Sequence, residues 1–302
     1  MQAQPVSLHH ISDTHIEGGV EIVAYDAAYD RLHAIGTAGR MVLDFTEEGV
    51  PTLSRLSAFS DTQQWDATSI AIDPAGRGFG VVSWVPTPPD SVPGMVQVID
   101  LETGIPIWQF SIGYHPDCVM FSPDGMVLYA ANEGEAHSTD RPGAITIADL
   151  SAIGSARDFA GFNSVRTYEF NEDHVAAGVD LSALRVPSAH ASDPGIAIEP
   201  EYIGATARGA WVSLQENNGL GFFDLQTRAW TRVILLGTLS FPLDLSESDG
   251  AHSTPGMGSD CSRCPTRSRC TRRSGDRSSL RRTRVRNSTC TRCDWVTRSI
   301  ED

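Results

Sequence analysis

Apolar side chains along the first 250 residues occur in short runs separated by turns rich in Pro, Gly and Asp. One apolar run ends in such a turn at Ile70–Gly76 (IAIDPAG). A second ends in the same way 49 residues later, at Val119–Gly125 (VMFSPDG). The runs Val96–Leu101 and Ile145–Leu150 have the same offset of 49 residues. Short apolar runs that end at Pro/Gly turns and recur at a fixed spacing predict a repeat made of β-strands.

Weaker copies of this repeat begin at Ile22 and Tyr202. Each copy contains three strand-like runs, and a fourth follows in places, as at Ile105–Phe110 and Thr231–Leu236. Four antiparallel strands in about 45–50 residues are typical of a β-propeller blade. We therefore predict an all-β protein with a partial β-propeller of about four four-stranded blades. A β-sandwich with chance echoes is the alternative fold.

The repeat suggests a division of the chain into a lead-in segment (1–16), propeller blades (17–250) and a tail (251–302). Residues 151–193 do not match the repeat and are expected to form an irregular insertion. Propellers close with four to eight blades. Because the pattern stops near Gly250, the simplest expectation is the front part of a larger propeller. Its open edge makes self-association a candidate interaction.

The tail differs from the body in composition and charge. All 23 basic residues are Arg; eleven Arg against 33 acids give the first 250 residues a charge of −22, and twelve against five give the tail +7. Five of the six cysteines also lie in the tail. Three interpretations compete: a zinc site at Cys261, Cys264, Cys290 and Cys293, a basic arm, or a disordered stretch translated out of frame. We favour the last, because no strands stand between the two Cys pairs and no hydrophobic period is present.

Charge and hydropathy argue against a nucleic-acid-binding protein and against a membrane-spanning one. A net charge of −15 argues against a nucleic-acid partner, which needs a basic face. The longest apolar runs, such as Val233–Leu236, are far shorter than the ~20 residues of a membrane-spanning helix. No signal peptide is visible at the start, which lacks both a basic stretch and an apolar core.

Five segments carry a resemblance to a known family. They follow one another as Glu21–Asp26, Pro116–Gly125, Ala131–Glu135, Glu199–Ile203 and Leu214–Asn218. In this order they resemble the choice-of-anchor I family of secreted YVTN-type propellers, over residues 17–250. The resemblance implies an extracellular or periplasmic protein. Full-length members continue with more blades and normally start with a signal peptide, and some are described as alkaline phosphatases.

Acidic side chains recur at one position of the repeat. Five residues before the turn residues Asp26, Asp73, Ser122 and Thr206 lie Glu21, Thr68, Asp117 and Glu201. In a propeller this position begins the innermost strand, beside the central channel, and the second strands end on the same face. Carboxylate and amide oxygens are ligands for hard cations, Ca²⁺ before Mg²⁺. The candidate ligands are Glu21, Asp117, Glu133, Glu135, Glu199, Glu201, Glu216 and Asn217. A merely solvated acidic rim is the alternative.

Evidence for catalysis is thin. Asp13-Thr-His15 resembles the first metal-binding segment of calcineurin-like metallophosphoesterases, but the later segments of that family are absent, so we interpret it as coincidence. There is no G-x-S-x-G motif and no P-loop, and no catalytic residue can be named.

The first hypothesis is therefore a secreted or surface-associated propeller that binds an unknown ligand at its acidic face. The alternative is a metal-dependent phosphoesterase of the alkaline phosphatase or phytase type. It would require several carboxylates that converge on one point. A third possibility is a chain without function because its ring cannot close.

Overall fold

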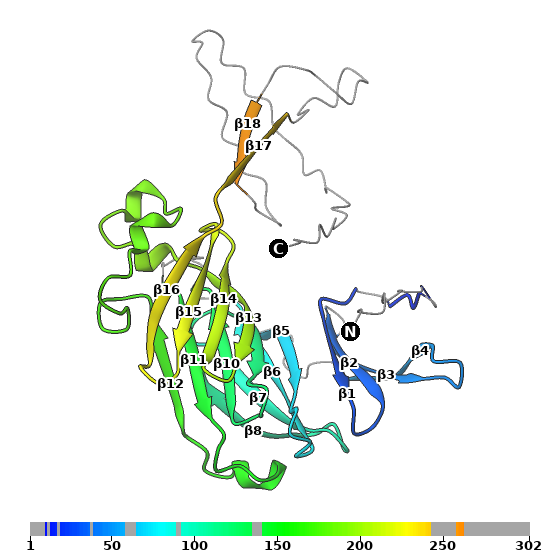
Figure 1. Ribbon diagram of the computed structural model, residues 1–302. Helices are drawn as coiled ribbons and strands as arrows, with labels where there is room; N and C mark the ends of the chain where they lie inside the picture. Colours follow the sequence, from blue (N-terminus) through cyan, green and yellow to red (C-terminus); the bar gives the residue numbers. More distant parts are fainter. Residues whose placement is uncertain are drawn as a thin grey trace, which may run out of the picture.

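The computed structural model describes residues 10, 13–16, 19–36, 39–57, 65–88, 92–134, 141–242 and 258–262. The described chain forms four four-stranded antiparallel sheets in which each strand pairs with the next along the chain (Figure 1). The all-β class and the four propeller blades predicted from the repeat are confirmed.

Each blade uses one copy of the repeat. Blade 1 contains β1 (Ile22–Asp26), β2 (Arg31–Gly36), β3 (Gly39–Phe45) and β4 (Pro51–Ser57). Blade 2 contains β5 (Trp65–Ile72), β6 (Phe79–Pro86), β7 (Met95–Asp100) and β8 (Pro106–Ser111). Blade 3 contains β9 (Pro116–Phe121), β10 (Val127–Asn132), β11 (Ala144–Asp149) and β12 (Val165–Glu169). Blade 4 contains β13 (Pro200–Thr206), β14 (Gly209–Leu214), β15 (Gly219–Asp224) and β16 (Ala229–Leu235).

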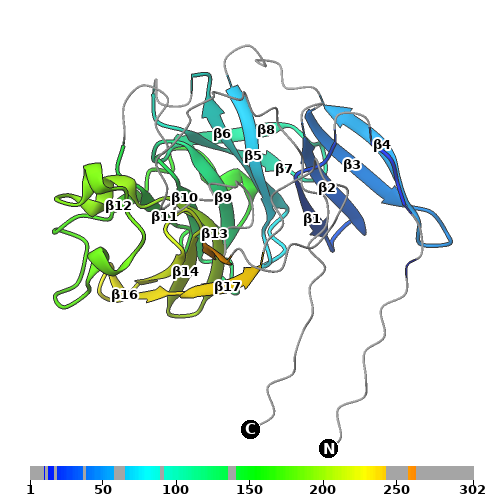
Figure 2. The ribbon, with the colours of Figure 1, turned by 90° about the horizontal axis from the view of Figure 1, so that it is seen from above.

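The blades follow one another in an arc, with their first strands innermost (Figure 2). Strand β1 lies beside β5, β5 beside β9, and β9 beside β13. Apolar cores fill the spaces between blades. Ile35 of blade 1 packs with Ile70 of blade 2, for example, and Val81 of blade 2 packs with Val119 of blade 3. Burial of one face of each sheet against its neighbour is what holds such a repeat together.

Arginine side chains also join the blades. Arg77, in the β5–β6 turn, pairs with the buried carboxylate of Asp73 at 2.7 Å. The same guanidinium donates to the Leu150 and Ile153 carbonyls of blade 3 at 3.3 and 2.8 Å. Arg31 of blade 1 pairs with Asp26 at 3.1 Å and donates to the Leu101 carbonyl of blade 2. A repeated Asp–Arg pair thus connects blade 1 to blade 2 and blade 2 to blade 3.

The segment 151–193, predicted as an irregular insertion, contains one regular strand of the propeller. Its middle supplies β12, the fourth strand of blade 3. Around β12 it forms short 3₁₀ turns, and more follow before β13: Ala156–Phe159, Leu181–Ala183, Ser188–His190 and Pro194–Ala197. Phe170 stacks on Trp230 of blade 4 at 3.9 Å between ring centroids, so this segment completes the contact between blades 3 and 4.

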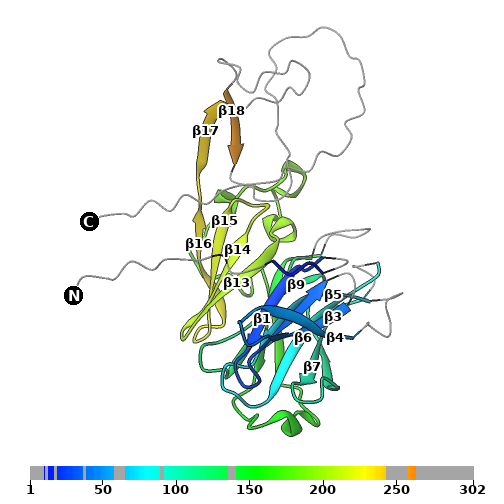
Figure 3. The same ribbon diagram turned by 90° about the vertical axis from the view of Figure 1, so that its right-hand side faces the viewer.

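The remaining described strands form a separate hairpin. β17 (Thr238–Pro242) pairs with β18 (Gly258–Ser262) and extends away from the arc (Figures 1 and 3). Five residues of the predicted tail therefore form a strand, and the rest of the tail lies outside the described residues. Across the described part of the chain, no helix is long and apolar enough to cross a membrane.

Candidate functional site

The repeated acidic position coincides with a repeated backbone irregularity. In blade 2 the pairing of β5 with β6 skips Thr68, and in blade 3 the pairing of β9 with β10 skips Asp117. In blade 4 the pairing of β13 with β14 skips Glu201 and Tyr202. Such β-bulges turn a side chain away from the regular alternation and are common beside functional sites. Glu21 lies just before β1, where its N–H bonds to the Ile35 carbonyl at 3.0 Å.

Glu201 lies at the centre of the acids that the structure brings together. Its carboxylate accepts a hydrogen bond from the Gln215 side chain. Burial, followed by the charges of Asp117, Glu216 and Glu199, raises the pKa of Glu201 to about 8, against its usual 4.5. Blades 3 and 4 therefore place their carboxylates close enough for one of them to hold its proton near neutral pH.

Tyr202 lies next to these carboxylates and is 53% exposed. Burial and the charges of Asp117, Glu201 and Glu21, together with Cys118, raise the pKa of its phenol. The influence of Glu21 brings blade 1 into the same region. We call Asp117, Glu199, Glu201, Glu216 and the Tyr202 ring the acidic patch; Glu21 lies at its edge.

Other predicted ligands have different surroundings. Glu133 lies 3.3 Å from Nδ1 of His115, a residue that belongs to no motif in the sequence. His115 has a positive φ of 47°. Its carbonyl accepts the N–H of Glu133 at 2.8 Å, so this backbone bond beside the ends of β9 and β10 brings the two side chains together.

Asn217 is buried. Its Oδ1 accepts the N–H of Glu199 at 2.9 Å, and its Nδ2 donates to the Arg185 and Ala197 carbonyls. Asn217 thus holds the backbone of Glu199 in place, and its role as a metal ligand stays a prediction. Glu216 keeps its place beside Glu201 and is also 3.9 Å from Arg185.

Several sequence-based candidates lie outside what the structure describes. Glu135, Cys264, Cys290 and Cys293 are outside the described residues, and of Cys261 only the backbone in β18 is described. Asp13 of the lead-in segment is almost fully exposed and lies 3.0 Å from His10.

A ready-made cation site is absent from the described residues. They include no group of three or more His, Cys, Asp or Glu side chains arranged to hold a metal ion. The carboxylates of the acidic patch are near enough to perturb one another but do not converge as a coordination sphere.

Comparison with known proteins places this architecture in a family. The family model of the choice-of-anchor I domain matches residues 21–258. The chain belongs to the choice-of-anchor I family. The match includes all four blades and every residue of the acidic patch, as the resemblance of the five segments predicted. No curated protein matches this family member.

The chain is also similar to solved structures. One is the β-propeller domain of Cps50 (Swd1) from Myceliophteria thermophila, 13% identical with a TM-score of 0.41, covering 68% of this chain and 56% of that one. Another is a functionally unknown protein from Desulfotomaculum acetoxidans DSM 771, 15% identical with a TM-score of 0.42, covering 75% and 59%. The chain thus spans somewhat more than half the length of these structures.

Proposed function

We propose that this choice-of-anchor I protein is a binding protein whose acidic patch receives a cationic group of its ligand. The observation that carries the proposal is the cluster of carboxylates around Glu201 on the bulged first strands of blades 3 and 4. Crowded carboxylates repel one another, and a bound cation relieves that repulsion.

The chemistry of the patch suits more than one cation. Carboxylate oxygens bind Ca²⁺, whereas an exposed aromatic ring beside carboxylates also suits an ammonium or guanidinium group. Tyr202 supplies such a ring. Ca²⁺ and spermidine are therefore the two probes to compare.

Isothermal titration calorimetry tests the proposal. Because Glu201 holds a proton near neutral pH, binding of a cation should release it, and the measured heat should then depend on the ionisation enthalpy of the buffer. We expect at least one probe to bind, and the double variant Asp117→Asn/Glu201→Gln to bind it at least tenfold more weakly.

The matched control is Glu47→Gln, which removes an exposed carboxylate from the β3–β4 turn. This variant should bind the probe as tightly as the wild type does. If neither probe binds at millimolar concentration, or if the double variant binds as tightly as the control, the proposal is wrong.

A surface or secreted location belongs to the same proposal and is supported by family membership. Protease treatment of intact cells, followed by detection of the chain, tests it. No observation on the described residues favours the phosphoesterase alternative, which stays a prediction that hydrolysis of p-nitrophenyl phosphate would test.

A further inference from the structure

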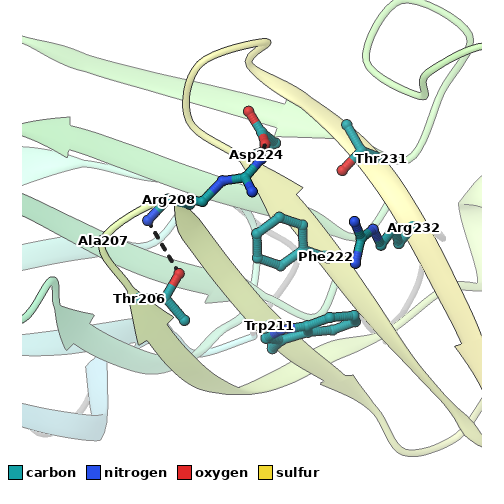
Figure 4. A pocket seen from close by; sticks show the side chains of 8 residues that line it. All are labelled: Thr206, Ala207, Arg208, Trp211, Phe222, Asp224, Thr231 and Arg232. Carbon is teal, nitrogen blue, oxygen red and sulfur yellow. Dashed lines mark hydrogen bonds and ion pairs between the residues drawn. The ribbon is translucent and has the colours of Figure 1, made fainter.

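A hollow of about 490 Å³ lies on blade 4, on the side away from blade 3. Its lining includes Thr206 and Arg208 at the β13–β14 turn (Figure 4). Glu201 lies near the other end of β13. Trp211 and Phe222 form its apolar floor, with ring centroids 4.9 Å apart. The lining residues are Thr206, Ala207, Arg208, Trp211, Phe222, Asp224, Thr231 and Arg232.

The repeat shows what this face does in the other blades. Trp211 on β14 pairs with Gly204 on β13, two positions before the turn residue Thr206. In blades 1, 2 and 3 the residues that pair at this position are His33, Val81 and Tyr129. Those three side chains are at most 1% exposed. Val81 is buried by blade 3 and Tyr129 by blade 4. The face that carries Trp211 is thus built to receive a following blade.

Arg208 supports the same interpretation. Arg31 and Arg77, in the corresponding turns of blades 1 and 2, donate to backbone carbonyls of the following blade. Arg208 occupies that turn in blade 4, where Asp224 lies 3.5 Å away, and its side chain is 78% exposed. In the described part of the chain no further four-stranded sheet follows blade 4. Strands β17 and β18 extend beyond the end of β16 (Figure 3).

The complementary face is exposed on blade 1. Val23 corresponds in register to Ile70, Val119 and Ile203, which pack against the preceding blade and are 3–5% exposed. Val23 itself is 52% exposed, and Tyr25, on the same side of β1, is 53% exposed. Blades 2, 3 and 4 each pack this face against the preceding blade. In blade 1 the same face is exposed, so it matches the face of blade 4 that carries Trp211.

We propose that the free face of blade 4 binds blade 1 of a second copy of this chain, head to tail. The contact continues the interface that already joins blades 1 to 2, 2 to 3 and 3 to 4. Two copies can make two such contacts, giving eight blades, which is within the range of closed propellers. This inference goes beyond the proposed function and does not depend on it.

Sedimentation velocity of the 302-residue chain tests the proposal. We expect the wild type to sediment at twice the monomer mass at micromolar concentration. The fraction of dimer should rise with salt concentration, because salt screens the net charge of −15 on each copy. Trp211→Glu and Tyr25→Glu, on opposite faces, should each sediment as monomers. Their mixture should recover a dimer, because one intact contact remains between the two variants.

Two further variants keep the test decisive. Arg208→Glu, at an exposed turn, should also weaken the dimer even if Trp211→Glu fails to fold, which circular dichroism would reveal. Ile105 is 60% exposed and lies just before the outermost strand of blade 2, so Ile105→Glu should leave the dimer unchanged. A wild type that stays monomeric overturns the proposal. So does a dimer that resists Tyr25→Glu, because its contact would not involve blade 1.

Discussion

Replacing Glu201 by Gln tests how strongly the acidic patch acts on its central carboxylate. Gln keeps the shape of the side chain and cannot ionise. In the folded protein the pKa of Glu201 is about 8, against its usual 4.5. The folded state therefore holds a proton that the unfolded state has lost, and this stabilisation, complete below about pH 4.5, disappears as the pH rises to about 8.

The size of the effect follows from the two pKa values. Each unit of pKa corresponds to 1.36 kcal/mol, which would give about 4.8 kcal/mol for a fully buried group. Glu201 is only partly buried, so screening by solvent reduces the expected effect to about 1–2 kcal/mol. Glu201→Gln should gain this much stability relative to the wild type between about pH 4.5 and pH 9.

Urea denaturation of both proteins across this pH range measures the difference. The other titrating groups are shared by the two proteins and largely cancel in the comparison. Glu47→Gln is the control and should show no trend. If the stability difference between Glu201→Gln and the wild type stays constant within about 0.3 kcal/mol, the neighbouring carboxylates do not act on Glu201 as described.

Three further predictions concern the contacts between blades. Arg77→Ala leaves the buried carboxylate of Asp73 without its ion pair and should destabilise the fold by about 3–5 kcal/mol in urea denaturation. Phe170→Ala removes one ring of the buried stack with Trp230 and should cost about 3–5 kcal/mol, measured in the same way. Burial lowers the pKa of His33 to about 4, so folding stability should fall as the pH drops from about 6.5 to 4, and this part of the slope should vanish in His33→Gln.

Matched changes at exposed positions serve as controls. Arg166→Ala on β12 and Ile105→Ala before β8 are both at exposed positions and should each change stability by less than about 0.5 kcal/mol. Losses below about 1 kcal/mol for Arg77→Ala or Phe170→Ala would mean that these contacts do not hold the blades together. A pH slope unchanged in His33→Gln would contradict the burial of a neutral imidazole.

Much of the fold and part of the site could be predicted from the repeat. Strand and turn patterns depend on residues a few positions apart, so the sequence displays them directly. Counting back from the turn residues selected Asp117 and Glu201, and the structure places both on bulges of neighbouring first strands. Equal positions in consecutive blades are close in space because each blade repeats the same path.

Other features could not be predicted in this way. Nothing in the sequence showed that the carbonyl and amide of Asn217 bond to backbone groups, or that Glu133 meets His115. The fourth strand of blade 3 was hidden because Val165–Glu169 stands at an unusual distance from the rest of its copy.

The sequence by itself determined the strands, the turns, the blade order and the acidic positions, because these follow from local pattern and from repetition. Only the tertiary structure decided which carboxylates perturb one another and which faces stay uncovered. Those properties depend on side chains from different blades, and packing alone sets their distances. The pKa of Glu201 and the partial burial of Trp211 are both of this kind: each depends on which side chains a neighbouring blade places against it.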